Sequence, residues 1–225
     1  MKKIKQIVTI FATLALAVTA GLSFAGTKTK AAGSDEFTRT AIEIAADMGY
    51  GWNLGNTMEA TNTWTSNPKV TDFETAWGQP VTTKDMIDGI KKAGFNSIRI
   101  PVSWSNMMSS DGNYTIDASY FKRVDEIISY AFANDMYVII NDHYDGGWWE
   151  HFCGNKRDCM KHYKSMWTQV AEHYKDYSEK LIFESANEEL GDSLKKSLSK
   201  IDVNISDTAL YNLVNEINQT FVDIV

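Results

Sequence analysis

The sequence is poor in cysteine and in positive charge. It has two cysteines among 225 residues, so no framework of disulfides can carry the fold. Their spacing, CGNKRDC, is not that of a zinc site. The formal net charge of -7 at pH 7 argues against a protein that binds the phosphate backbone of a nucleic acid. No linker or low-complexity stretch divides the chain, and 44% hydrophobic with 23% charged residues is typical of a globular domain.

Transmembrane-length hydrophobic runs are also missing. The apolar run at the N-terminus, over residues 7–20, is shorter than the ~20 residues that a membrane-spanning helix needs. Three lysines precede it and the small residues Ser23 and Ala25 follow it, which predicts a secretory signal peptide over residues 1–25. An uncleaved membrane anchor is the alternative. We therefore expect a secreted, extracellular protein that has no membrane contact after cleavage and begins with a short tip over residues 26–35.

Neither a metal site nor a cofactor is predicted. The four histidines are spread out along the chain, and His162 and His173 lie on a polar-leaning helix, where exposure to solvent is the usual outcome. A calcium ion in a loop is left open. In an exported protein Cys153 and Cys159 could bond to each other, and two unlinked thiols in a loop are the alternative.

Four short apolar runs recur, and a helical pattern follows each of them. The runs are rich in Ile, Val, Phe and Tyr without clean alternation, which indicates strands buried on both faces of a parallel sheet. Apolar stripes at helical spacing separate them. The expected strands are 50–54, 97–102, 137–141 and 181–184, and the helices follow at about 82–94, 117–131, 163–174 and 206–224. We expect Thr82, three residues before Asp85, to begin the first of these helices.

This β-α order fits either an open doubly wound sheet or part of a (β/α)8 barrel. A nucleotide-binding open sheet normally carries a glycine-rich turn after its first strand. Gly49, Gly51 and Gly55 have the wrong spacing for that turn, and no helix pattern starts there. The sequence therefore favours the barrel.

Polar side chains stand at or near the end of every expected strand. Ligands of parallel α/β folds bind at these carboxyl ends. Arg99 alone could be a structural ion pair, because an unpaired buried charge is costly, and His143 alone could be a core histidine. Their joint occurrence on successive strands favours a site. The residues concerned are Asn53 and Asn56, Arg99, Asn141 and His143, and Asn187 and Glu188.

Tryptophans surround these positions. Aromatic faces beside hydrogen-bonding groups suit sugar rings, which have apolar CH faces and polar edges. We assign Trp52 and Trp167 to packing, and expect Trp148 or Trp149 to line a cleft.

Five segments in this order resemble glycoside hydrolase family 5, in particular its bacterial endoglucanases. The segments are GWNLGNTMEA, TAWGQPVTT, GFNSIRIPVSW, YVIINDHYDGGW and LIFESANEE. The resemblance covers about residues 36–225. It implies a (β/α)8 TIM barrel, of which this chain holds about the first four β/α units, and an enzyme that hydrolyses β-1,4-glucosidic bonds with retention of configuration.

The resemblance also implies roles for individual residues. Glu188 matches the general acid/base and Asn187 the residue that bonds the sugar 2-hydroxyl. Arg99 matches the arginine that supports the nucleophile, and His143 matches the active-site histidine. The chain departs from the pattern at Glu189, where the family usually has Pro, and at Tyr144, where many relatives have a second His. We expect substrate to contact Asn53, Trp104, Tyr144, Trp148 and Trp149.

A retaining glycosidase needs two carboxyl groups about 5 Å apart, and the second is not evident here. Glu184 lies four residues before Glu188, roughly 13 Å along a strand, and Asp142 should face away from the barrel axis. In the family the nucleophile is a Glu at the end of the seventh strand. We therefore expect an N-terminal half over residues 36–225, with the nucleophile beyond it and a monomeric full-length form.

Three functions are distinguished. The first is a secreted endoglucanase acting on cellulose or a related β-glucan, with xyloglucan, lichenan, xylan and mannan as alternative substrates. The second is a non-catalytic carbohydrate-binding fragment. The third is an unrelated structural α/β domain, which would require the five motifs to coincide by chance.

Overall fold

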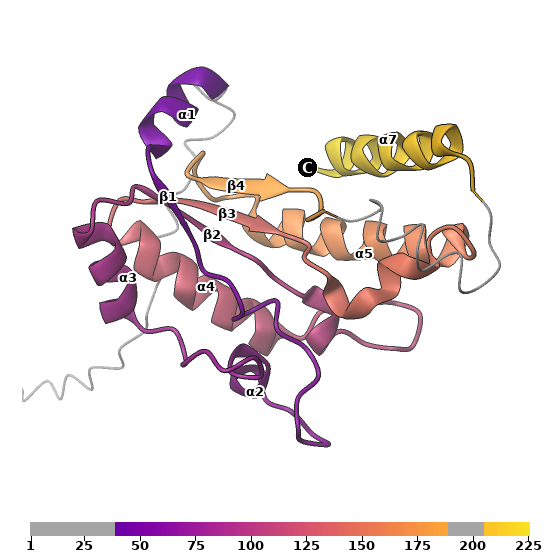
Figure 1. Ribbon diagram of the computed structural model, residues 1–225, viewed down its shortest axis with the longest axis horizontal. Coiled ribbons are helices and arrows are strands. Elements are labelled where there is room, and N and C mark those ends of the chain that lie inside the picture. Colours follow the sequence, from indigo (N-terminus) through magenta and orange to yellow (C-terminus); the bar gives the residue numbers. More distant parts are fainter. Residues whose placement is uncertain (1–38, 189–204) are drawn as a thin grey trace, which may run out of the picture.

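A computed structural model of the chain describes residues 39–188 and 205–225 (Figure 1). The expected signal peptide over residues 1–25, the tip over residues 26–35 and the departure at Glu189 lie outside the described residues. Among those that are described, no helix has the length and apolar character to cross a membrane. Cys153 and Cys159 are free thiols, and burial raises the pKa of Cys159 to about 11.

Four parallel strands form one sheet in the order β1-β2-β3-β4. They are β1 (Gly51–Asn53), β2 (Ser97–Ile100), β3 (Tyr137–Asn141) and β4 (Leu181–Glu184), and each lies within the range expected from the sequence. The register places Asn53 beside Arg99, Arg99 beside Ile139, and Ile139 beside Ile182. Because side chains alternate along a strand, these four residues project from one face of the sheet.

Helices connect the strands and pack mainly on the opposite face (Figure 1). Asp117 and Ser206 begin α4 and α7 by accepting backbone N–H groups. The expectation that Thr82 begins α3 is wrong: Thr83 accepts the N–H of Met86, while Thr82 is buried. The helices are α1 (Ala41–Met48), α2 (Val70–Glu74), α3 (Lys84–Lys92), α4 (Ala118–Phe132), α5 (Lys156–Tyr174) and α7 (Asp207–Ile224), with 3-10 turns η1 (Trp104–Met107) and η2 (Asp145–His151).

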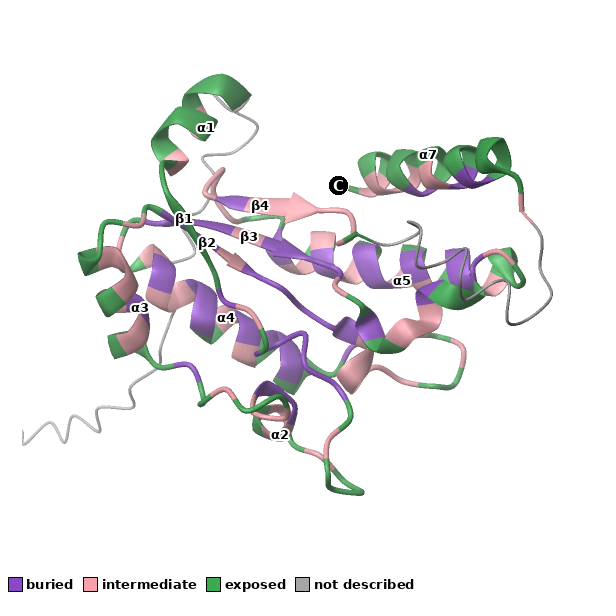
Figure 2. Cartoon of the chain, in the orientation of Figure 1, coloured by how far each residue is buried: buried purple, intermediate pink, exposed green. Residues whose placement is uncertain are grey.

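The core lies between the sheet and helices α3, α4 and α5, where the buried residues gather (Figure 2). The side chains of alternate strand residues enter it, among them Ile98, Ile100, Val138 and Ile140, which are fully buried. The other face of the sheet is less covered, because Ile139 and Ile182 keep part of their surface exposed. The two faces of the sheet are therefore in different environments: one packs against helices, and the other carries Arg99.

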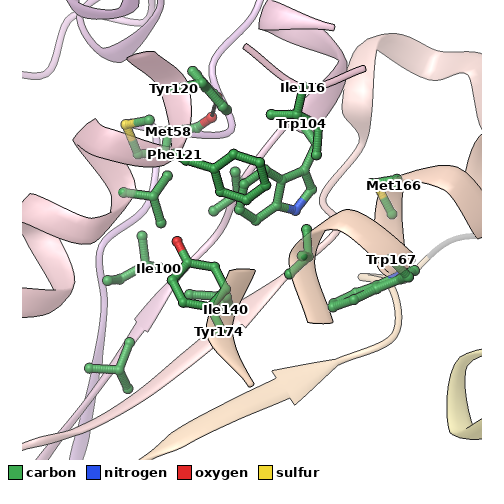
Figure 3. Packing of buried hydrophobic residues seen from close by; sticks show 14 of the residues in the cluster. Met58, Ile100, Trp104, Ile116, Tyr120, Phe121, Ile140, Met166, Trp167 and Tyr174 are labelled. Carbon is green, nitrogen blue, oxygen red and sulfur yellow. Dashed lines mark hydrogen bonds between the residues drawn. The ribbon is translucent and has the colours of Figure 1, made fainter. Parts of the chain in front are cut away.

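Trp104 belongs to this core, so the expectation that it binds substrate is wrong in this structure. It is 0% exposed and packs against Tyr120 and Phe121 (Figure 3). Its indole N–H donates to the carbonyl of Asn141 at 2.9 Å, which satisfies its only polar group. Trp167 is buried as expected, whereas Trp52 is 45% exposed, with one edge against Phe95.

A buried ion pair ties α2 to α4. Both carboxylate oxygens of Glu74, which is 0% exposed, accept from Arg123, at 2.9 Å from Nε and 2.8 Å from Nη2. The same carboxylate accepts the N–H of Thr82, and Arg123 donates to the Thr82 carbonyl. This bidentate pair thereby holds the segment that leads into α3.

We expect Glu74→Ala to lower the free energy of unfolding by about 3–5 kcal/mol, because Arg123 would stay buried without its partner. Urea denaturation followed by circular dichroism measures the change. Glu126→Ala is the matched control, since Glu126 pairs with the same arginine from the protein surface. Its cost should be at most about 1 kcal/mol. Equal costs for the two variants would contradict the buried pairing.

Candidate active site

Arg99 is the centre of a hydrogen-bond network at the carboxyl edge of the sheet. Its Nε and Nη2 donate to the two carboxylate oxygens of Glu184, at 2.7 and 2.6 Å. Nη1 donates to Asn53 Oδ1 at 3.0 Å, and Nη2 also reaches Asn187 Oδ1 at 2.9 Å. One guanidinium therefore joins the ends of β1, β2 and β4 and the loop after β4.

Asn141 and His143 extend this network from β3. The Asn141 amide group donates to Glu184 Oε1 at 3.1 Å and lies 3.3 Å from His143 Nδ1, while its Oδ1 accepts the N–H of Val102. These partners fix which end of the Asn141 amide is the donor, so Nδ1 of His143 accepts and its ring proton is assigned to Nε2. Burial, with Arg99 adding to it, lowers the pKa of His143, which keeps the imidazole neutral.

The Arg99–Glu184 pair is ionised. Burial acts to raise the pKa of Glu184, but hydrogen bonds from Arg99 and Asn141 outweigh it, and the pKa lies below its usual value. The hydrogen bond to Glu184 correspondingly raises the pKa of Arg99. The sequence analysis considered Glu184 only as a second reacting carboxylate and did not predict its ion pair with Arg99. Strand register would have indicated the pair, since Glu184 lies beside Asn141 on the face of the sheet that carries Arg99.

A second carboxylate that sequence reasoning missed is Glu59, in the loop after β1. It is 3% exposed, and its oxygens accept the N–H groups of Asn56 and Thr57 at 2.5 and 2.8 Å. Burial raises its pKa, against the hydrogen bonds and the charge of Arg99. The Ser103 hydroxyl lies 2.8 Å from both the Glu59 and the His143 carbonyl oxygens, and so links the loops after β1, β2 and β3.

Glu188 stands at the exposed rim of the network. It follows β4 directly after Asn187, whose amide group lies 3.4 Å from the Glu188 carboxylate. The backbone N–H of Asn187 donates to the Asp142 carbonyl at 2.9 Å and so holds this segment against the end of β3. Glu188 also interacts electrostatically with Arg99 and His143. The structure thus brings Asn53, Arg99, His143, Asn187 and Glu188 to one edge.

The three aromatic residues expected after β3 differ in exposure. Tyr144 is 42% exposed, whereas Trp149 is 1% exposed and donates its indole N–H to Asp142 at 3.0 Å. Trp148 is partly buried and stacks on both Trp149 and His162, with ring centroids 4.6 and 4.2 Å apart. The expectation that Trp149 binds substrate is therefore wrong in this structure, because packing covers its ring.

The expected exposure to solvent is wrong for His162, whereas His173 keeps 31% of its side chain exposed. Phe121 stacks on His173, and Trp148 and Tyr114 stack on His162. No group of three or more His, Cys, Asp or Glu side chains in residues 39–188 and 205–225 is placed to hold a metal ion.

We expect Trp149→Ala to reduce the free energy of unfolding by roughly 3–5 kcal/mol, since it leaves a cavity beside Phe152 and Tyr163 and deprives Asp142 of a donor. Trp64→Ala is the control, because Trp64 is 98% exposed, and should change stability by no more than about 0.5 kcal/mol. Thermal melting of both variants provides the comparison. If Trp149→Ala melts like Trp64→Ala, the buried placement is incorrect.

Repeated strand–helix units with acidic, amide and arginine side chains at their carboxyl edge are typical of enzymes built on a (β/α)8 barrel. Comparison with known proteins agrees. The model of the family described as Cellulase (glycosyl hydrolase family 5) matches residues 58–225. The chain belongs to this family, as the five segments predict, and an unrelated α/β domain is excluded.

Curated relatives are endoglucanases. Endoglucanase A of Paenibacillus barcinonensis is 41% identical over 218 residues, covering 94% of this chain and 51% of that protein. Endoglucanase A of Clostridium longisporum is 47% identical over 151 residues, covering 67% of this chain and 29% of that protein. The chain therefore spans about half of the length of the first relative and less than a third of the second.

Solved structures give the same family and fold. A broad-specificity endoglucanase from Ruminococcus champanellensis, with bound cellotriose, superimposes with a TM-score of 0.73 at 39% identity, covering 83% of this chain and 53% of that one. A lichenase from Caldicellulosiruptor sp. F32 superimposes with a TM-score of 0.72 at 41% identity, covering 83% of this chain and 50% of that one. The fold is thus that of a (β/α)8 barrel, of which the described residues form four strands.

Proposed function

We propose that this chain is the N-terminal half of the catalytic domain of a secreted endo-β-1,4-glucanase, which hydrolyses cellulose or a related β-glucan with retention of configuration. The observation that carries the proposal is the position of Glu188 and Asn187, next to the Arg99 network at the carboxyl edge of a family 5 barrel. The full-length form is monomeric, and its partner is the polysaccharide.

In this mechanism Glu188 is the general acid/base. Its carboxyl group protonates the leaving glycosidic oxygen and then takes a proton from the attacking water. The nucleophile is a glutamate beyond this chain. Its carboxylate attacks the anomeric carbon to give a glycosyl-enzyme, which water hydrolyses. Two carboxyl groups complete both steps, so no metal or cofactor takes part.

The Arg99 network orients the groups around that reaction. Because Arg99 holds Asn187 Oδ1, the amide of Asn187 turns its N–H donors toward the side where Glu188 stands, where one can bond the sugar 2-hydroxyl. Glu184 offsets part of the Arg99 charge, and the remainder favours an ionised nucleophile nearby. His143 is neutral and offers its Nε2 proton to substrate.

Substrate contacts come from Asn53, from the exposed Tyr144 and from the partly buried Trp148. Relatives differ in what they act on: one solved structure is a xyloglucan-specific endo-β-1,4-glucanase and another is a lichenase. Cellulose, mixed-linkage glucan and xyloglucan are therefore the first substrates to test. A non-catalytic, carbohydrate-binding role is the second candidate for the chain by itself, because it spans only about half of Endoglucanase A of Paenibacillus barcinonensis.

The role of Glu188 is tested in a chimera. In it, this chain replaces the matching half of Endoglucanase A from Paenibacillus barcinonensis, which supplies the remainder of the barrel. We expect Glu188→Gln to lower hydrolysis of barley β-glucan by about 10²- to 10⁴-fold, because the amide has the same shape but cannot donate the proton. Binding of cellotetraose should persist, and an aryl glycoside with a good leaving group should lose less activity. Near-normal turnover of β-glucan would overturn the assignment.

Residues 26–225 expressed alone should release no reducing sugar from cellulose, because no glycosyl-enzyme forms without the nucleophile. The edges of β1 and β4 and the thinly covered face of the sheet should also cause self-association. Gel filtration and a reducing-sugar assay test both points. A soluble, monomeric and active chain would show that the nucleophile lies within this sequence.

A further inference from the structure

The loop after β3 has an unusual backbone. Four consecutive residues, Tyr144 to Gly147, adopt positive φ angles of 53°, 50°, 73° and 79°. Gly146 and Gly147 tolerate this region, but Tyr144 and Asp145 are strained there because of their Cβ atoms. Strain of this kind persists only where surrounding contacts determine the conformation. This loop directly follows His143, so whatever holds it also affects the candidate active site.

The side chain of Asp145 supplies contacts that hold the loop. It is 1% exposed, accepts hydrogen bonds from Ser105 and Trp148, and also bonds the Asp142 carboxyl group, while burial raises its pKa. The Ser105 N–H donates to Oδ1 at 2.6 Å, and the Ser105 hydroxyl and the Trp148 indole N–H donate to Oδ2, each at 2.7 Å. A buried carboxylate is retained only with such donors. Asp145 therefore connects its own loop to η1, which follows β2.

His162, on α5, contacts the Ser105 hydroxyl and the Trp148 ring. Its ring lies between those of Tyr114 and Trp148, with centroids 4.4 and 4.2 Å away. Its Nε2 is 3.0 Å from the Ser105 hydroxyl oxygen, and burial lowers its pKa to about 4. With the Ser105 hydroxyl donating to Asp145, we assign the His162 tautomer whose proton is on Nε2, so that this nitrogen donates to Ser105. The order of donation is His162 to Ser105 to Asp145.

This order does not suit nucleophilic catalysis. In a catalytic triad the histidine lies between the hydroxyl and the carboxylate and takes the hydroxyl proton. Here the hydroxyl lies between the other two groups and gives its proton to the carboxylate. The contacts instead join three separate parts of the chain: the loop after β2, the loop after β3 and the outer helix α5.

We propose that Asp145, Ser105 and His162, together named the Asp145 cluster, hold the strained loop after β3 and thereby position His143 and Tyr144 at the edge of the sheet. These three are positioning residues: they act through the loop and do not touch substrate. The consequence for turnover rests on the proposed endoglucanase function, whereas the effect on the loop does not.

The effect on the loop is tested by hydrogen exchange on the full 225-residue chain. His162→Phe keeps an aromatic ring between Tyr114 and Trp148 but removes the N–H donor. We expect amide exchange in residues 142–151 to increase at least about fivefold, with that of β3 unchanged. Ser105→Ala, which removes the central hydroxyl, should have the same effect.

His173→Phe is the matched control. His173 also lies on α5, stacks on Phe121 at 4.2 Å and bonds a carboxylate, that of Asp125, at 3.0 Å. It lies 11 residues further along α5 than His162, which is about three helical turns or ~16 Å away, so loop exchange should stay at the wild-type rate. Unchanged exchange in both His162→Phe and Ser105→Ala, or an equal increase in His173→Phe, would overturn the proposal.

Kinetics of the chimera provide the second measurement. A misplaced active-site loop costs up to about 10²-fold in rate, so His162→Phe should lower kcat on β-glucan by about 10- to 100-fold, with a smaller change in KM. His162→Gln, which restores an N–H donor, should recover part of that loss. Loop exchange that rises while kcat stays constant would refute positioning. An inactive wild-type chimera would instead count against the endoglucanase function and leave the exchange result to decide on the loop.

Discussion

The ion pair between Arg99 and Glu184 is the interaction on which the candidate site depends. It reaches from β2 to β4 and passes over β3, whose Asn141 also bonds the same carboxylate. A half-buried arginine and a half-buried carboxylate are each costly alone, and the pair is stabilised because each of the three guanidinium nitrogens has an acceptor. With the guanidinium fixed, the amide orientations of Asn53 and Asn187 follow. The electrostatics of the site are therefore set by one contact between side chains that are 85 residues apart.

Most of the fold could be predicted from the sequence, because the local preferences for strand, helix and helix cap agree with the way the elements pack in the sheet. The runs at 97–102 and 137–141 are rich in apolar residues without clean alternation, as buried strands of a parallel sheet are, and Asp117 caps α4. Polar residues at the strand ends converge for a geometrical reason: parallel strands bring their carboxyl ends to one edge. The shift from Thr82 to Thr83 at the start of α3 has a tertiary cause, since the Glu74 carboxylate accepts the Thr82 N–H.

The exposure of the tryptophans could not be predicted, because it depends on which neighbours arrive from elsewhere in the chain. Trp148 and Trp149 are adjacent in sequence, yet η2 turns one ring into the core beside Tyr163 and leaves the other at its margin. The same limitation explains the error at His162. A histidine on a polar-leaning helix is exposed to solvent unless a ring from another part of the chain covers it. Here Tyr114, from the loop after β2, stacks on His162.

The sheet order has a consequence for how the protein acquires its structure. Within residues 39–188 and 205–225, each strand after β1 pairs with the strand that precedes it in the chain, and no pairing skips a neighbour. A pairing between adjacent β/α units closes a shorter loop than a pairing that skips a unit, so it costs less entropy of loop closure. Pairing of β2 with β1 and of β3 with β2 can therefore proceed as the polypeptide leaves the ribosome, in the order in which the strands are synthesised.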